Sequence, residues 1–98
     1  MAKFVQIIQF ESDNIDDMIK LEQEYLKATE GKRSSGHGMT CADRDKPGRY
    51  FTIVEFDSPE AAEKNNDNPE TKAFAEKMMK VGKGEPTFYN LDVVFEGG

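Results

Sequence analysis

Tryptophan is absent from this 98-residue chain, which also has only one cysteine and one histidine. A single thiol cannot form an internal disulfide. No CxxC or HxxxH pattern is present, and His37 and Cys41 would lie roughly 13 Å apart on a strand rising about 3.3 Å per residue. We therefore expect no metal site, and we expect Cys41 to be a small buried hydrophobe.

Long apolar runs and an excess of positive charge are absent as well. No stretch approaches the roughly 18 apolar residues that a membrane span needs, and the apolar run in MAKFVQIIQFESD is too short for a signal peptide. The net charge is −6, and the Lys and Arg residues are scattered, whereas nucleic-acid binding relies on clustered positive charge. We expect a cytoplasmic protein with no membrane or nucleic-acid partner.

The composition is that of a folded globular protein. Hydrophobic residues make up 37% of the chain and charged residues 33%, which does not indicate disorder. The length suits a single domain over residues 1–98. A chain this short buries a modest core, so association with a second copy would add to its stability.

The first element predicted is a strand over residues 3–11, KFVQIIQFE, because aromatic and branched side chains dominate it. Side chains alternate between the two faces of a strand. One face would carry Phe4, Gln6, Ile8 and Phe10, and the other Val5, Ile7 and Gln9. Both faces are largely apolar, so we expect both to be covered.

An amphipathic helix should follow. Apolar residues recur at helical spacing between Ser12 and Gly31, with Ser12 or Asp13 as the expected N-cap and Gly31 just past the end. The apolar positions are Ile15, Met18, Ile19, Tyr25 and Leu26. We expect the charged face of this helix to be exposed to solvent.

A hairpin is predicted after a polar loop at residues 31–36, GKRSSG. Its first strand would be residues 37–43, HGMTCAD, and its second residues 49–56, RYFTIVEF. Pro47 and Gly48 suit the two central positions of a type II turn. Asp43 and Asp45 flank this turn, where local structural roles are expected.

The stretch FTIVEFDSPEAAEK, residues 51–64, predicts a strand that leads into a helix, with Ser58 as N-cap and Pro59 at the first helical position. A second helix start is predicted at Asn68-Pro69, and Gly82 should follow its last residue. A final strand is expected over residues 87–96, TFYNLDVVFE. The order β-α-β-β-α-β is the ferredoxin-like α+β arrangement with an antiparallel sheet.

At this level the chain resembles the dimeric α+β barrel superfamily, and within it the small proteins grouped around the antibiotic biosynthesis monooxygenases. The resemblance rests on the strand order, on VEFDSPEAAEK and NPETKAFAEKM, and on the ending PTFYNLDVV. The stretch from CADRDKPGRY to LDVV is similar to a group of small bacterial proteins of this type. The likeness covers nearly the full chain and specifies a scaffold rather than a reaction.

This resemblance implies a homodimer whose sheets pair face to face, with a pocket between each sheet and its own helices. Relatives that degrade haem line that pocket with an asparagine, a tryptophan and a histidine. This chain has no tryptophan and no histidine in its second helix region, so we do not expect haem. We expect no other cofactor.

The lone His37, in the segment GHGM, is the candidate general base, although it also suits a rim position on the surface. If Phe56 faces the helices, alternation places its strand neighbours with it, and we expect the last strand to add two more. The candidate ligand-binding residues are Gln6, Tyr50, Thr52, Val54, Phe56, Tyr89 and Leu91. They suit a flat apolar or aromatic molecule, unless they simply fill the core.

Three functions are compatible with the sequence. One is a cofactor-independent monooxygenase-like enzyme acting on an aromatic or apolar substrate, with His37 as its base. Another is a non-catalytic protein that binds a ligand in the same pocket, and a third is a dimeric accessory or structural module whose pocket is collapsed. The fold resemblance favours the enzyme, and the lack of a clear acid-base set favours the other two.

Overall fold

Residues 3–31 and 35–97, the part of the chain that this computed structural model describes, form four strands and three helices. In chain order the elements are β1 (Phe4–Glu11), α1 (Ile15–Ala28), β2 (Ser35–Ala42), β3 (Arg49–Phe56), α2 (Pro59–Asn66), α3 (Pro69–Val81) and β4 (Lys83–Asp92). The predicted order is confirmed, with two helices between β3 and β4. Of the polar loop predicted at residues 31–36, residues 32–34 lie outside the described residues, and residues 35–36 belong to β2.

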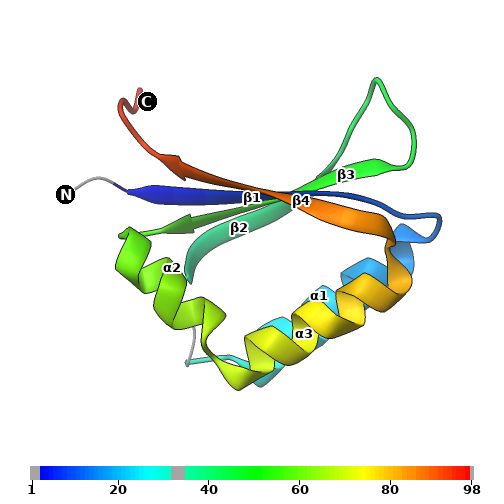
Figure 1. Ribbon diagram of the computed structural model, residues 1–98, viewed down its shortest axis with the longest axis horizontal. Coiled ribbons are helices and arrows are strands. Elements are labelled where there is room, and N and C mark those ends of the chain that lie inside the picture. Colours follow the sequence, from blue (N-terminus) through cyan, green and yellow to red (C-terminus); the bar gives the residue numbers. More distant parts are fainter. Residues whose placement is uncertain (1–2, 32–34, 98) are drawn as a thin grey trace.

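The strands form one antiparallel sheet in the order β2-β3-β1-β4, so β3 and β1 are central. All three helices lie on the same side of the sheet, with α1 beside α3 and with α2 near one end (Figure 1). No helix or strand of the described residues covers the other face (Figure 1). We call it the open face. This arrangement is the ferredoxin-like α+β fold predicted from the element order.

Strand pairing decides which side chains face the helices. In β1 and β3 the facing pairs are Phe4 with Phe56, Gln6 with Val54, Ile8 with Thr52, and Phe10 with Tyr50. The predicted face of β1 and the predicted shared face of Tyr50, Thr52, Val54 and Phe56 are therefore confirmed. Thr40 and Thr52 confirm the direction of this face, because both hydrogen-bond to Glu22 of α1.

The prediction that Tyr89 and Leu91 share this face is wrong. Tyr89 pairs with Ile7 and Leu91 pairs with Val5, so both lie on the open face. Phe88 and Asn90 occupy the helix-facing positions of β4. Alternation within one strand fits either face equally well, and only the register against β1 decides between them.

Several boundaries differ from those expected. The N-cap of α1 is Asn14 rather than Ser12 or Asp13, and the buried Ser12 hydroxyl accepts a hydrogen bond from the Asn14 N–H at 3.1 Å. β4 begins at Lys83 and ends at Asp92, whereas the sequence predicted 87–96. The early start includes an irregularity in the pairing with β1, where Gly84 has a φ of 72°.

The predicted starts of α2 and α3 and the predicted turn between β2 and β3 are confirmed. Ser58 Oγ accepts from the Ala61 N–H at 3.1 Å, and Asn68 Oδ1 accepts from the Glu70 N–H at 2.9 Å. In the hairpin the Arg49 N–H donates to the Lys46 carbonyl at 3.2 Å, and Gly48 has the positive φ, 89°, that a type II turn requires.

α3 ends at Val81 and Gly82 follows it, as predicted, but the Gly82 backbone is extended rather than left-handed. Its N–H donates to the Met78 carbonyl at 2.9 Å. A Cβ at this position would lie 3.1 Å from the same carbonyl oxygen, which is tighter than ordinary van der Waals contact. Glycine is therefore favoured here by close approach of the backbone.

The buried apolar side chains lie toward the two ends of the layer between sheet and helices. Toward one end Phe10 is 5% exposed and stacks on Tyr50, with ring centroids 5.7 Å apart. Toward the other, Phe56 is 3% exposed and lies 6.3 Å from the Phe4 ring. Among the described helices, none has the length and apolar character needed to cross a membrane.

Candidate functional site

On the helix-facing side of the two central strands only Phe10 and Phe56, toward the two ends, are fully buried. Gln6, Ile8, Thr52 and Val54 lie halfway along the two central strands, yet all four remain half-buried. Tight helix packing over these positions would bury them fully. We call this region the interlayer site; it comprises Gln6, Ile8, Glu22, Thr40, Thr52, Val54 and Asn90, between the Phe10/Tyr50 and Phe4/Phe56 pairs.

A carboxylate from α1 reaches into the interlayer site. Glu22 Oε1 accepts hydrogen bonds from Thr40 Oγ1 at 2.7 Å and from Thr52 Oγ1 at 3.3 Å, and the two threonine hydroxyls lie 3.0 Å apart. These bonds connect α1 to both β2 and β3. Glu22 is half-buried, so the expectation that the charged face of α1 is exposed to solvent does not extend to this residue.

Helical spacing in the sequence indicates that Glu22 lies on the buried face of α1, although a charged residue is normally expected on the exposed face. Glu22 follows Met18 by four residues and precedes Tyr25 by three, so these three side chains share one face of α1. Met18 is 1% exposed. A glutamate within such a stripe is a buried-polar candidate. Two further residues were missed, Thr40, which bonds Glu22, and Asn90, which bonds Gln6, and both could be identified only from strand pairing.

At the β4 side the interlayer site is more open. Gln6 Nε2 donates to Asn90 Oδ1 at 3.2 Å, and this pair is exposed. Phe88 also faces the helix layer, yet it is 54% exposed. The helices therefore leave the β4 edge partly uncovered.

His37 lies in β2 and is exposed. It precedes Gly38, which pairs with Val54 on the helix-facing side, so alternation along β2 places His37 on the open face with Met39 and Cys41. No hydrogen bond or ion pair connects it to another described residue. Within residues 3–31 and 35–97 there is no cluster of three or more His, Cys, Asp or Glu side chains suited to a metal.

Cys41 is half-buried and pairs with Phe51 on the open face. It therefore does not belong to the buried core that the sequence suggested for it. Its row across the sheet continues through Phe51 to Gln9. Its burial depends on what covers that face.

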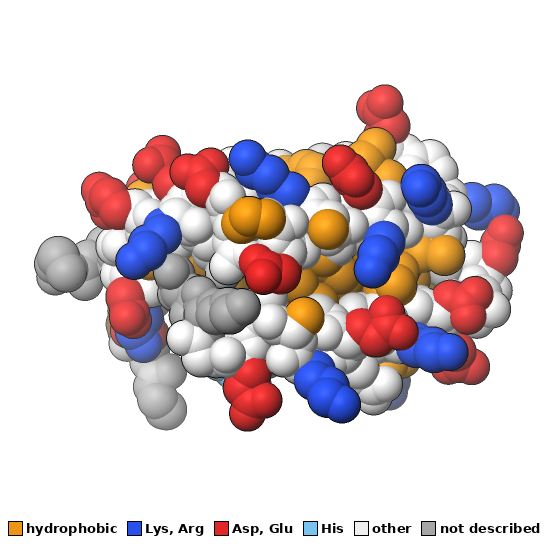
Figure 2. Space-filling view, turned by 90° about the horizontal axis from the view of Figure 1, so that it is seen from below, with side chains coloured by type: hydrophobic (Ala, Val, Ile, Leu, Met, Phe, Trp, Pro, Cys, Tyr) orange, Lys and Arg blue, Asp and Glu red, His pale blue; other side chains and the backbone are white. Residues whose placement is uncertain are grey.

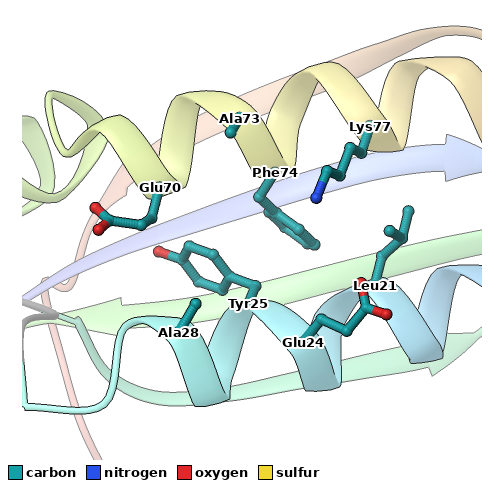
Figure 3. A pocket seen from close by; sticks show the side chains of 8 residues that line it. All are labelled: Leu21, Glu24, Tyr25, Ala28, Glu70, Ala73, Phe74 and Lys77. Atoms are coloured by element: carbon teal, nitrogen blue, oxygen red, sulfur yellow. The ribbon is translucent and has the colours of Figure 1, made fainter.

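A hollow lies on the outer side of the helix layer, away from the sheet. The seam between α1 and α3 exposes apolar side chains bordered by charges (Figure 2). Tyr25 and Phe74 stack there with centroids 4.6 Å apart, inside a hollow of about 190 Å³ (Figure 3). The Tyr25 hydroxyl lies 2.7 Å from Thr71 Oγ1. This hollow contains none of the residues predicted to bind a ligand.

The hairpin carries a strong ion pair outside the interlayer site. Arg49 donates from Nε to Asp43 Oδ2 at 2.8 Å, and its Nη2 lies 2.6 Å from the same oxygen. The hydrogen bond from Arg49, followed by one from the Asp45 backbone, lowers the pKa of Asp43 below 3.8. The local structural role predicted for Asp43 is confirmed.

Neither a protein-family model nor a curated protein sequence matches this chain. Similarity appears at the level of structure. An antibiotic biosynthesis monooxygenase-like protein from Caulobacter crescentus aligns with a TM-score of 0.82 at 13% identity, covering 96% of this chain and 92% of that one. One from Nitrosomonas europaea aligns with a TM-score of 0.79 at 8% identity, covering 98% and 94%.

SnoaB from Streptomyces nogalater, a cofactor-independent oxygenase, aligns with a TM-score of 0.81 at 9% identity, covering 96% of this chain and 95% of SnoaB. Identities this low establish a common fold and carry no assignment of reaction or substrate. The chain therefore has, over almost its whole length, the fold of antibiotic biosynthesis monooxygenase-like structures.

Proposed function

We propose that this protein binds a small, largely apolar or aromatic molecule in the interlayer site. The observation that carries the proposal is the incomplete burial of Gln6, Ile8, Thr52 and Val54 in the middle of the two central strands. Aromatic pairs border the site at both ends, and a few polar groups converge on its middle. Apolar walls with a few placed polar groups are typical of small-molecule sites.

We infer further that the bound molecule is the substrate of a monooxygenase-like reaction that uses no cofactor. The shared fold with SnoaB supports this inference. One oxygen atom of O₂ would enter the substrate, and the other would leave as water with two substrate hydrogens, so no external reductant is consumed. The protein would contribute exclusion of water, orientation and a base; His37, on the open face of β2, is the base candidate that the sequence offers.

The binding proposal is tested by thermal unfolding with quinols, polycyclic phenols, short acyl compounds and haem. A ligand that binds only the native state raises its apparent stability. A side chain at Gly38 would enter the site beside Val54, and a Cβ there meets no atom closer than 3.5 Å. Gly38→Leu should therefore abolish a shift that Gly38→Ala retains.

A compound that stabilises the wild type but not Gly38→Leu is then assayed for oxygen consumption. Turnover should fall by about two orders of magnitude in His37→Ala, the range expected for loss of a general base, with unchanged thermal unfolding. Wild-type turnover in His37→Ala would exclude it as the base. Ligand binding without oxygen consumption would favour the non-catalytic binding protein. No shift with any class would favour a dimeric accessory module.

We also infer that two copies of the chain pair through the open face. Met39, Ile53, Ile7 and Tyr89 form one apolar row across all four strands. Met39 on β2 is 46% exposed, and Leu91, on the same face of β4, is 44% exposed. An apolar centre with polar residues toward the border is the usual composition of a protein interface, and two-fold pairing is the commonest form of self-association.

A further inference from the structure

We propose that Glu22 recognises the bound molecule by accepting a hydrogen bond from a hydroxyl group on it. This inference rests on the proposed binding of a ligand in the interlayer site and names the residue that selects among ligands there. It predicts a molecule with an apolar ring and a hydroxyl at one end, rather than a pure hydrocarbon or a cationic amine.

The two oxygens of the Glu22 carboxylate are used differently. Oε1 accepts from Thr40 and Thr52, whereas Oε2 has no hydrogen bond to any other residue that the structure describes. A carboxylate offers about four acceptor positions, and polar groups away from bulk water are normally partnered. The half-buried Glu22 therefore presents an acceptor that remains available to a ligand.

The threonines also fix the position of that acceptor. Thr40 and Thr52 stand on neighbouring strands, and their hydroxyls contact each other at 3.0 Å as well as contacting Glu22. A long side chain held from two strands loses little further freedom when a ligand binds. The carboxylate of Glu22 is thus held against the sheet before any ligand binds.

The surface beside Glu22 favours a ring that carries a hydroxyl. In the same row across the sheet Thr52 is followed by Ile8 and then by Phe88. A ring lying on Ile8 would have Glu22 at one end and Phe88 at the other. A ligand ammonium has three donors to satisfy, and this row offers one carboxylate beside an apolar surface, so a hydroxyl with one donor fits better.

A structural role for Glu22 can be separated from recognition by Glu22→Gln. Glutamine keeps a carbonyl oxygen that can accept from Thr40 and Thr52, so the connection of α1 to the sheet is retained. Its amide NH₂ replaces the available oxygen and can only donate. The variant therefore preserves the anchoring and reverses the hydrogen-bonding preference toward the ligand.

The test measures binding of three probes by calorimetry: naphthol, its methyl ether and naphthylmethylamine. Wild type should bind naphthol more tightly than the ether by on the order of tenfold to a hundredfold, the range for a hydrogen bond to a charged group. Glu22→Gln should bind the two equally or prefer the ether. Its melting temperature should stay close to that of wild type.

Each of three outcomes would contradict a different part of the proposal. Failure of all three probes to bind wild type, together with no shift in the wider ligand panel, would overturn the binding proposal itself. Equal binding of naphthol and its ether by wild type would overturn only the role of Glu22. Tighter binding of the amine than of naphthol would overturn the choice of a hydroxyl.

A measurement on the wild type covers the case in which Glu22→Gln does not fold. Carbon-13-labelled glutamate allows the Glu22 carboxyl resonance to be followed by NMR. We expect this resonance to move when naphthol is added and to stay in place with the methyl ether. Movement with neither probe, although both bind, would place the hydroxyl elsewhere and overturn the inference.

Discussion

The two faces of the sheet have opposite arrangements of polar and apolar residues. On the helix-facing side, aromatic pairs lie toward the ends of the central strands and polar groups gather between them, around Glu22 and Gln6. On the open face the middle row is apolar, and polar side chains such as Arg49 and Glu55 lie toward the ends of β3. Each strand contributes to both patterns by alternation.

This contrast indicates two different tasks. An apolar centre with a polar border suits burial against another protein surface, because water is excluded from the centre first. A polar centre between apolar ends is unsuited to a simple core, since buried polar groups cost free energy unless they are partnered. The open face therefore fits association with a second copy, and the helix-facing middle fits a small molecule.

The largest expected effect is on the free energy of unfolding. It compares the Phe10 end of the helix-facing side with the β4 edge, which is more exposed. Phe10→Ala should lower the free energy of unfolding by about 4 kcal/mol, because it removes a buried ring stacked on Tyr50. Phe88→Ala, on the same face but 54% exposed, should cost about 1 kcal/mol. Urea unfolding measures both. Equal losses would show that the β4 edge is as closed as the Phe10 end.

The second prediction concerns the open face. Ile53→Asp should weaken self-association by about a hundredfold, because an unpaired carboxylate in an apolar interface costs on the order of 3 kcal/mol. Ile53→Leu, which keeps an apolar side chain of the same size, is the control and should associate like wild type. Light scattering across a concentration series measures the change. A dimer that survives Ile53→Asp unchanged would place the interface elsewhere.

The third prediction concerns a smaller effect on the free energy of unfolding. It compares one threonine on each face of the sheet. Thr40→Val removes a 2.7 Å hydrogen bond to Glu22 and should lower the free energy of unfolding by about 1.5 kcal/mol. Thr87→Val changes an exposed residue that pairs with Gln9 on the open face, and it should stay within about 0.5 kcal/mol of wild type. If the two variants were equally stable, the Glu22 cluster would contribute nothing to stability.

The smallest effect concerns the Asp43–Arg49 pair. The folded pKa of Asp43 is lowered, so its contribution to stability is present above the unfolded pKa near 3.8 and is lost as pH falls through the folded pKa. The stability advantage of wild type over Asp43→Asn should therefore shrink as the pH is lowered from about 5 to about 2. An advantage that does not change with pH would contradict the assigned cause.

Features set by a few neighbouring residues were predictable from the sequence. The caps at Ser58 and Asn68 and the Pro47-Gly48 turn each involve a hydroxyl, an amide or a positive φ acting within four residues. The periodicity of β1 and β3 also predicted which of their side chains face the helices, including four of the candidate ligand-binding residues on β3. Local chemistry decides such features, so no tertiary information was needed.

Features set by pairing between distant segments were not predictable in the same way. Tyr89 and Leu91 satisfy alternation on either face, and the register between β4 and β1 placed them on the open face. Likewise Glu22 looks like one more charge on α1 until β2 and β3 bring Thr40 and Thr52 against it. Asn90 became a partner of Gln6 only through the same register.

By itself, the sequence determined the elements and their order, because periodicity, caps and turns are short-range properties of the chain. The tertiary structure alone decided which face of β4 joins the interlayer site, and it brought the Glu22 carboxylate to the two threonines. The physical reason is that these contacts join segments 18 and 30 residues apart in the Glu22 cluster and 84 apart in the Gln6–Asn90 pair. Only the paired sheet with its helix layer brings such segments together.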